Sequence, residues 1–159
     1  MKLKEISKLV FSIIICQLAG AIGSIFTSQS IAGWYTSLNK PFFNPPNWVF
    51  GPVWITLYLL MGVSLYLVWI RGINKPKVKI ALAIFGIHLF LNASWSIIFF
   101  GLRSPFYAFL EIILLWLAIL LTMTKFYKIS KTAAYLLIPY IIWVTFAAIL
   151  NYSIWVLNI

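Results

Sequence analysis

Long apolar stretches separated by short polar connections extend over almost all of the chain's 159 residues. A bilayer core of roughly 30 Å requires about 20 consecutive apolar residues in a helix, and five stretches reach that length. The pattern therefore predicts an all-α integral membrane protein, a single domain over residues 1–159 that forms a five-transmembrane-helix bundle. The expected spans are residues 6–26, 47–70, 80–100, 105–125 and 133–156.

The connection between the first two spans, residues 27–46, is long, and loops of this length are usually functional or disordered. Its composition is not that of a disordered segment. In addition, Ser30 is placed to cap a short helix over residues 31–38. That helix carries Trp34 and Tyr35, whose rings are expected to pack on the end of the helix bundle. Further along, three prolines keep the chain extended until the second span begins. They are Pro41, Pro45 and Pro46.

The composition supports membrane insertion and suggests a cavity lined by aromatic rings. The chain is 64% apolar and only 9% charged, with a mean hydropathy of +1.03, whereas about a quarter of the residues in soluble proteins are charged. Eight tryptophans exceed what interfacial belts need in so small a protein. Some of these rings are therefore expected to line a cavity.

The net charge of +10 does not indicate a nucleic-acid partner, because the basic residues sort by membrane side. Lys40 and Arg103 fall on the side of the C-terminus, and the other ten fall on the side of the N-terminus. The positive-inside rule then places the N-terminus in the cytoplasm, and the first loop and the C-terminus outside the cell membrane. The ten are Lys2, Lys4, Lys8, Arg71, Lys75, Lys77, Lys79, Lys125, Lys128 and Lys131.

The first apolar stretch has two interpretations. A basic start, an apolar run and the small residues 19–21 resemble a signal peptide with its cleavage site. As a retained helix, it would use Gln17 for an interhelical hydrogen bond and its small residues for close helix contact. Those small residues are Ala19, Gly20, Gly23 and Ser24.

Three helical faces carry the candidate site residues. On the second span, an aromatic stripe is either core packing or a cavity wall; it comprises Gly51, Trp54, Tyr58, Met61, Leu65 and Trp69. On the third span, His88, Asn92, Trp95 and Phe99 share one face near mid-membrane. His88 and Asn92 either bridge helices as a buried pair or, for Asn92, offer donor and acceptor to a ligand. The fifth span carries Trp143, Ala147 and Asn151 at four-residue steps.

Four further residues bear on the helices. Ser104 and Pro105 form a typical helix start. Glu111 is either a proton-relay or ligand group, or a carboxyl protonated or hydrogen-bonded to a neighbouring helix near Arg103. Pro139 is expected to kink the fifth span.

Conventional catalytic chemistry is absent from the sequence. One histidine, two acids and the single Cys16 provide no metal-ligand cluster, no disulfide and no nucleophile with its base. No cofactor or metal is expected. The remaining chemistry, aromatic faces with a few amides, suits a large, flat, mostly apolar ligand.

Taken together, these residues resemble the tryptophan-rich sensory protein/translocator protein family, formerly called the peripheral benzodiazepine receptor, over essentially the whole chain. The matching positions are Trp34-Tyr35, Leu38, Lys40-Pro41, Pro45-Pro46, Trp48, Gly51-Pro52-Val53-Trp54, Leu57-Tyr58, Met61-Gly62, Trp69, Asn92, Trp95, Phe99-Phe100-Gly101, Pro139-Tyr140, Trp143 and Leu150-Asn151-Tyr152.

The resemblance implies a five-helix bundle, often a homodimer, whose first loop closes a pocket for porphyrins such as protoporphyrin IX, for sterols in some lineages, and for synthetic isoquinoline carboxamides and benzodiazepines. The implied wall is Trp34, Trp54, Tyr58, Asn92, Trp95, Trp143, Ala147 and Asn151, and the implied lid includes Lys40, Pro41, Pro45, Pro46 and Trp48. The C-terminal sterol pattern is incomplete, because no Lys or Arg follows Tyr152.

Three functions remain open at this point. The chain is a membrane receptor or carrier for tetrapyrroles, or an enzyme that degrades porphyrin with light and oxygen, or a structural protein that dimerises through small-residue faces. Some members of the family that the chain resembles have been proposed to degrade porphyrin photochemically, and this resemblance implies Trp54 and Trp143 as the catalytic residues. An indole beside an excited macrocycle can share in radical or singlet-oxygen chemistry.

Overall fold

The computed structural model describes residues 3–159, so Lys2 lies outside the described range. The chain folds into helices α1 (Leu3–Ser30), η1 (Ile31–Tyr35), α2 (Asn47–Trp69), α3 (Pro76–Ser96), η2 (Ile97–Gly101), α4 (Pro105–Tyr127), α5 (Lys131–Tyr135) and α6 (Ile138–Leu157). Within this range five segments are long and apolar enough to cross a membrane, as predicted. They are Leu3–Tyr35, Asn47–Trp69, Pro76–Gly101, Pro105–Tyr127 and Lys131–Leu157.

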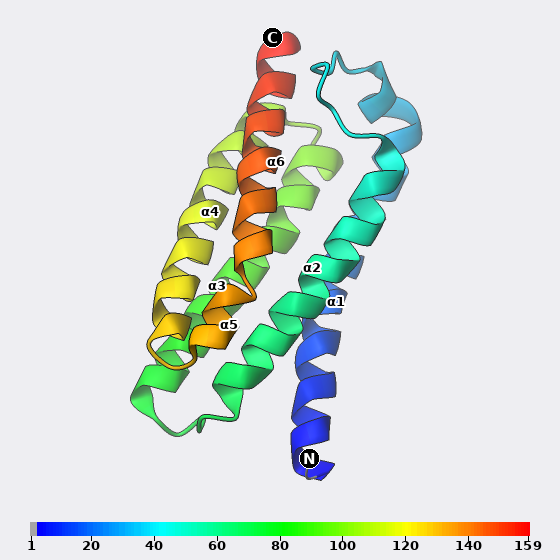
Figure 1. Ribbon diagram of the computed structural model, residues 1–159. Coiled ribbons are helices and arrows are strands. Elements are labelled where there is room, and N and C mark those ends of the chain that lie inside the picture. The colour runs from blue at the N-terminus through cyan, green and yellow to red at the C-terminus, as the bar shows by residue number, and fades with distance from the viewer. Residues whose placement is uncertain (1–2) are drawn as a thin grey trace.

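The helices form an elongated bundle in which α1 packs against α2 and α3, α3 against α4, and α4 against α6 (Figure 1). The N-terminus, the α2–α3 connection and the α4–α5 connection lie at one end of the bundle. The loop 38–46 and the C-terminus lie at the other end. Nine of the basic residues within 3–159 therefore lie on the helices and connections at the first of these ends: Lys4, Lys8, Arg71, Lys75, Lys77, Lys79, Lys125, Lys128 and Lys131.

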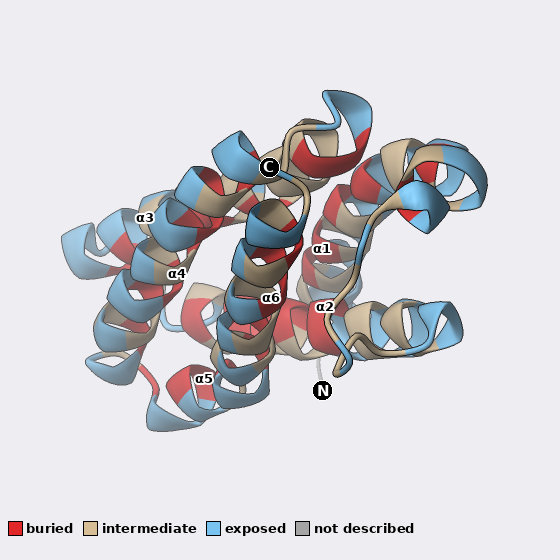
Figure 2. Cartoon of the chain, turned by 90° about the horizontal axis from the view of Figure 1, so that it is seen from above, coloured by how far each residue is buried: buried red, intermediate tan, exposed pale blue. Residues whose placement is uncertain are grey.

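The outer surface of the bundle is apolar. Buried residues face the centre and exposed residues face outward when the bundle is viewed from above (Figure 2). On α1 the exposed large residues recur every three or four positions, so one helical face is directed away from the protein. This face would be unfavourable in water and matches a lipid environment. It comprises Val10, Phe11, Ile14, Leu18, Ile22 and Ile25.

Small residues on α1 and α2 allow these helices to approach closely, as the retained-helix interpretation predicts. A Cβ added at Gly62 would lie 2.6 Å from Ile13 Cα, and one added at Gly20 would lie 2.3 Å from the Tyr58 ring. Gln17 Nε2 also donates a hydrogen bond of 3.0 Å to the Ile55 carbonyl. Close packing therefore holds the helices together up to the level of Tyr58.

The prediction of a separate short helix capped by Ser30 is wrong. Helix α1 runs on through Ser30 into η1, and only residues 38–46 form an irregular loop. The Ser30 hydroxyl donates to the Phe100 carbonyl at 2.7 Å instead of capping a helix. The expected packing of the rings is confirmed, because Trp34 and Tyr35 contact Phe99 at centroid distances of 5.6 and 6.3 Å.

Pro105 begins a helix as predicted, whereas the prediction that Pro139 kinks the fifth span is wrong, because Pro139 also begins a helix. Ser104 occupies the N-cap of α4 with Pro105 in the first turn, although the serine side chain makes no capping hydrogen bond. The last span is broken at residues 136–137 instead of being kinked within a continuous helix. Pro139 lies in the first turn of α6, where its missing N–H costs no helical hydrogen bond.

Candidate functional site

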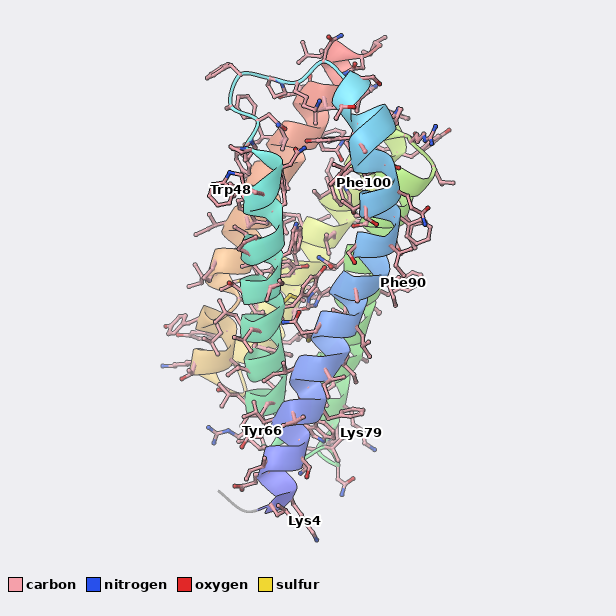
Figure 3. All side chains as sticks on the ribbon, turned by 90° about the vertical axis from the view of Figure 1, so that its right-hand side faces the viewer. Lys4, Trp48, Tyr66, Lys79, Phe90 and Phe100 are labelled. Carbon is pink, nitrogen blue, oxygen red and sulfur yellow. The ribbon has the colours of Figure 1, made fainter. Side chains whose placement is uncertain are left out.

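A cavity of about 670 Å³ lies between the outer halves of α1 and α2, with η2 and α6 behind it. Figure 3 shows α1 and α2 close together toward the N-terminal end and separated toward the loop end. The residues that line the cavity are Gln17, Gly20, Ala21, Gly23, Ser24, Thr27, Ser28, Ile31, Tyr35, Asn47, Phe50, Gly51, Trp54, Ile55, Tyr58, Trp95, Ser96, Phe99, Phe100, Trp143, Ala147, Leu150, Asn151 and Ile154.

Aromatic rings form the wall opposite α1. Trp54 stacks on Tyr58 with centroids 5.5 Å apart and an interplanar angle of 27°. Trp95 stacks on Phe99 at 5.1 Å and 23°. Trp143 meets Phe50 edge-on at 6.0 Å. Three indoles from three different helices therefore contribute to one cavity.

Most of the predicted wall lines this cavity, and the remaining two residues do not. The residues along the wall are Trp54, Tyr58, Trp95, Trp143, Ala147 and Asn151. Trp34 lies outside the lining and meets the lining residue Phe99 edge-on at 5.6 Å. Asn92 is buried, with 3% of its surface exposed, and lies outside the lining.

The Asn92 amide is engaged by two tyrosines. Its Oδ1 accepts a hydrogen bond from the Tyr58 hydroxyl, and its Nδ2 donates to the Tyr140 hydroxyl at 2.9 Å. The amide thus joins α2, α3 and α6 and acts on the cavity through Tyr58. Of the two interpretations of Asn92, this geometry favours a buried bridge between helices, but Asn92 forms it with the two tyrosines and not as a pair with His88, which contacts Thr122.

Asn151 holds Trp95 in place. Its Oδ1 accepts from Trp95 Nε1 at 3.0 Å, and its Nδ2 donates to the Pro105 carbonyl at 2.8 Å. Both polar groups of this buried amide are therefore satisfied within the protein. Trp143 differs, because its buried Nε1 has no hydrogen-bond partner among residues 3–159.

The contribution of α1 to the cavity was missed by sequence reasoning, which assigned its small residues to helix packing alone. Gly20 and Gly23 do pack closely, against Tyr58 and Ser96. However, small and hydroxyl-bearing residues continue along the same face at three- and four-residue steps, and this spacing was the available indication. The α1 lining is Gln17, Gly20, Ala21, Gly23, Ser24, Thr27 and Ser28.

The loop 38–46 is tied to the end of α6. The Asn158 side chain accepts from the Asn39 backbone N–H and donates to the Asn39 carbonyl, both at 2.9 Å. Asn39 Nδ2 also donates to the Leu157 carbonyl at 3.3 Å. These three hydrogen bonds form a clasp between Asn39 and the C-terminal end of α6.

The predicted lid residues lie around rather than within the cavity. Lys40 folds over the Tyr35 ring, with Nζ 4.7 Å from the ring centroid, and donates to the Leu38 carbonyl. Pro41 opens a turn closed by the Asn44 N–H, and Pro46 immediately precedes α2. Trp48 is 75% exposed on the outside of α2 (Figure 3).

Two buried ionisable side chains lie away from the cavity. His88 Nδ1 is 3.3 Å from the Thr122 hydroxyl, and its Nε2 has no partner in the described chain. The Glu111 carboxyl makes no hydrogen bond within residues 3–159, so the alternative of a hydrogen bond to a neighbouring helix near Arg103 is wrong. The described residues contain no group of three or more potential metal-binding side chains.

No side chain that lines the cavity carries a formal charge. The polar lining consists of amides and hydroxyls, and several of these are used internally: Ser24, Thr27 and Ser28 donate to carbonyls of their own helix. Their oxygens keep free acceptor capacity. The cavity is thus suited to a flat apolar body with few polar contacts.

Comparison with known proteins gives a match over nearly the whole chain. A family model described as the TspO/MBR family matches residues 12–156. The chain is 47% identical over 155 residues to the tryptophan-rich protein TspO of Archaeoglobus fulgidus, covering 97% of this chain and 99% of the relative. It is 44% identical over 155 residues to the protein of the same name from Chlorobaculum tepidum, covering 98% of each. It is 40% identical over 143 residues to the human translocator protein, covering 87% of this chain and 85% of the relative.

Proposed function

Because the chain belongs to the TspO/MBR family, we propose that it is a membrane receptor or carrier that binds porphyrins and related flat, hydrophobic ligands in the cavity between α1 and α2. The observation that carries this proposal is the convergence of Trp54, Trp95 and Trp143 on one uncharged cavity. Indole faces stack on flat π-systems, and the volume lies within the range of cavities that bury small ligands, about 300–1,000 Å³.

A porphyrin such as protoporphyrin IX also carries carboxylates, which an uncharged lining cannot neutralise. We therefore place the macrocycle among the indoles and the carboxylates toward the loop end, where Lys40 lies over the lining residue Tyr35. An ionised carboxylate is costly to bury without a partner, so this orientation is the favourable one.

Titration with protoporphyrin IX in detergent, in darkness, tests the proposal. Saturable quenching of tryptophan fluorescence is expected, and a Trp54→Ala, Trp143→Ala double variant should lose it. Trp69→Ala is the matched control, because Trp69 packs on Phe11 outside the cavity lining. Unchanged affinity and quenching in the double variant would refute the assigned site.

A second candidate function, light-dependent porphyrin degradation, is favoured by one contact. Trp54 lies 5.5 Å from Tyr58 and 6.3 Å from Tyr140, and both phenols are hydrogen-bonded to Asn92. This arrangement links a cavity indole to buried phenols that are suited to exchanging electrons with it. The test is the rate at which the porphyrin absorption spectrum bleaches under illumination in air. If it bleaches no faster with the wild-type protein than with the Trp54→Ala, Trp143→Ala variant, degradation is refuted and ligand binding is the only function that remains.

The proposed assembly is a homodimer, as the family resemblance implies, in which the loop end faces outside and the basic end faces the cytoplasm. The positive-inside rule supports this orientation. Light scattering in detergent tests the dimer, and labelling of single cysteines introduced at the two ends tests the orientation.

A further inference from the structure

A second concave surface, which the proposed function does not use, lies at the basic end of the bundle. It has a volume of about 460 Å³ and is formed by the α2–α3 connection together with the end of α4. We call it the basic pocket. Its lining residues are Arg71, Lys75, Pro76, Lys77, Val78, Lys128 and Ile129.

Tight turns bring the cations of the basic pocket together. The Gly72 N–H donates to the Trp69 carbonyl, and the Lys75 N–H donates to the Gly72 carbonyl, each at 3.1 Å. Gly72 has a φ of 111°, which glycine adopts without strain, and the Lys75 side chain lies against it, since an added Cβ would be 3.4 Å from Lys75 Cε. The turn therefore directs the Lys75 side chain back along the connection that also carries Arg71.

The other wall is fixed by the end of α4. The N–H groups of Ile129 and Ser130 both donate to the Phe126 carbonyl, at 2.9 and 2.7 Å. The chain reverses directly after Lys128 and restarts as α5 with Ser130 at its N-cap. Lys128 is consequently placed beside the cations of the α2–α3 connection, which lie more than fifty residues away in sequence.

Among the described residues, these four positive charges have no acidic partner. Within residues 3–159 the side chains of Arg71, Lys75, Lys77 and Lys128 make no ion pair or hydrogen bond. The chain has only two acids, Glu5 and Glu111, and neither lines the basic pocket. Like charges around one concave surface repel one another, so an anion bound among them is favoured.

The floor of the basic pocket decides what kind of anion fits. Val78, 2% exposed, and the half-buried Ile129 provide an apolar base below the cationic rim. Nearby, Lys8 lies 5.8 Å above the Trp69 ring, a pairing typical of the membrane–water boundary. An amphiphile can contact both the cationic rim and the apolar floor of the basic pocket. Its phosphate would lie among the cations, and its glycerol and acyl region would lie on the floor.

We propose that the basic pocket binds the phosphate headgroup of an anionic phospholipid from the leaflet on the N-terminal side. Basic pockets between transmembrane helices are known recognition elements for such headgroups. The proposal does not depend on the ligand of the large cavity. It differs from a general excess of positive charge at this end, because it requires a specific pocket and not the charge alone.

The test compares two variants with the same change in charge. Arg71→Gln, Lys128→Gln removes two pocket cations, whereas Lys4→Gln, Lys79→Gln removes two cations at the same end that do not line the pocket (Figure 3). Full-length delipidated protein in neutral detergent is titrated with phosphatidylglycerol, with phosphatidylcholine of the same acyl chains, and with inorganic phosphate. Native mass spectrometry counts the bound lipid molecules, and the melting temperature measures how much the bound lipid stabilises the folded protein.

Wild type and the control variant should bind phosphatidylglycerol alike. The pocket variant should bind it about 25-fold more weakly, at about fivefold for each of the two charges removed. Equal weakening in both variants would overturn the proposal in favour of diffuse charge. Inorganic phosphate bound as tightly as the lipid, or phosphatidylcholine bound as tightly as phosphatidylglycerol, would overturn the choice of ligand. If the pocket variant does not fold, Lys75→Gln, Lys77→Gln replaces it, since both side chains are exposed.

Discussion

The Trp95 indole N–H donates to Asn151 Oδ1 at 3.0 Å and thereby joins the end of α3 to α6 at the back of the large cavity. Because Asn151 is almost fully buried, Asn151→Leu would leave the Pro105 carbonyl without its donor and the indole N–H without an acceptor. A fully buried unsatisfied group costs about 1–3 kcal/mol, and the cost here is at the lower end because Trp95 and Pro105 are half-buried. We expect a lower melting temperature and weaker porphyrin binding.

A double-mutant cycle isolates this contact. Combining Trp95→Phe with Asn151→Leu should show a coupling of about 1 kcal/mol in the free energy of unfolding. Purely additive effects would mean that the hydrogen bond does not hold the two helices together.

The bridge through Asn92 predicts non-additive stability. Asn92→Leu should destabilise strongly, because it strands the buried hydroxyls of Tyr58 and Tyr140. Adding Tyr58→Phe and Tyr140→Phe should then restore part of the loss, since no buried donor or acceptor remains unpaired. Thermal unfolding of the single and triple variants measures this. A triple variant less stable than Asn92→Leu would contradict the bridging role.

The clasp between Asn39 and Asn158 predicts an effect on rates. Asn158→Ala removes two hydrogen bonds to Asn39, each worth about 1 kcal/mol net, so the loop should open more readily. Ligand association and dissociation, measured by stopped-flow fluorescence quenching, should both accelerate by up to about 30-fold, the factor that about 2 kcal/mol gives, with a smaller change in affinity. Ser153→Ala is the control at the same end, because its hydroxyl bonds only within α6. Unchanged rates in Asn158→Ala would show that the loop does not gate the cavity.

Substitutions at two glycines distinguish the loss of cavity volume from the loss of close helix packing. Gly51 lines the cavity, and a Cβ there would meet no atom within 4 Å, so Gly51→Leu should fold normally and bind porphyrin less well by occupying ligand space. Gly62→Ala should destabilise by about 1–3 kcal/mol, because its Cβ would lie 2.6 Å from Ile13 Cα. Melting temperature and dark titration together test the pair. If Gly51→Leu lowered the melting temperature and left the porphyrin affinity unchanged, Gly51 would be a packing residue and not a cavity residue.

Sequence reasoning located the helices because the length of an apolar run is a local property that the bilayer selects directly. It also identified the faces that meet the cavity, since residues three and four apart share one side of a helix: Trp54 with Tyr58, and Trp143 with Ala147. The excess of tryptophan indicated correctly that some of these rings line a cavity.

The partners of those faces depend on contacts between distant segments, and these only the tertiary structure decided. Helix α1 continues through Ser30 because the Ser30 hydroxyl and the following rings pack on η2, some seventy residues away. The Asn92 amide is consumed by two tyrosines, and the small face of α1 forms a cavity wall as well as a packing surface. Helical periodicity defines which side chains share a face, but hydrogen bonding and close packing between helices determine whether that face meets protein, lipid or open space.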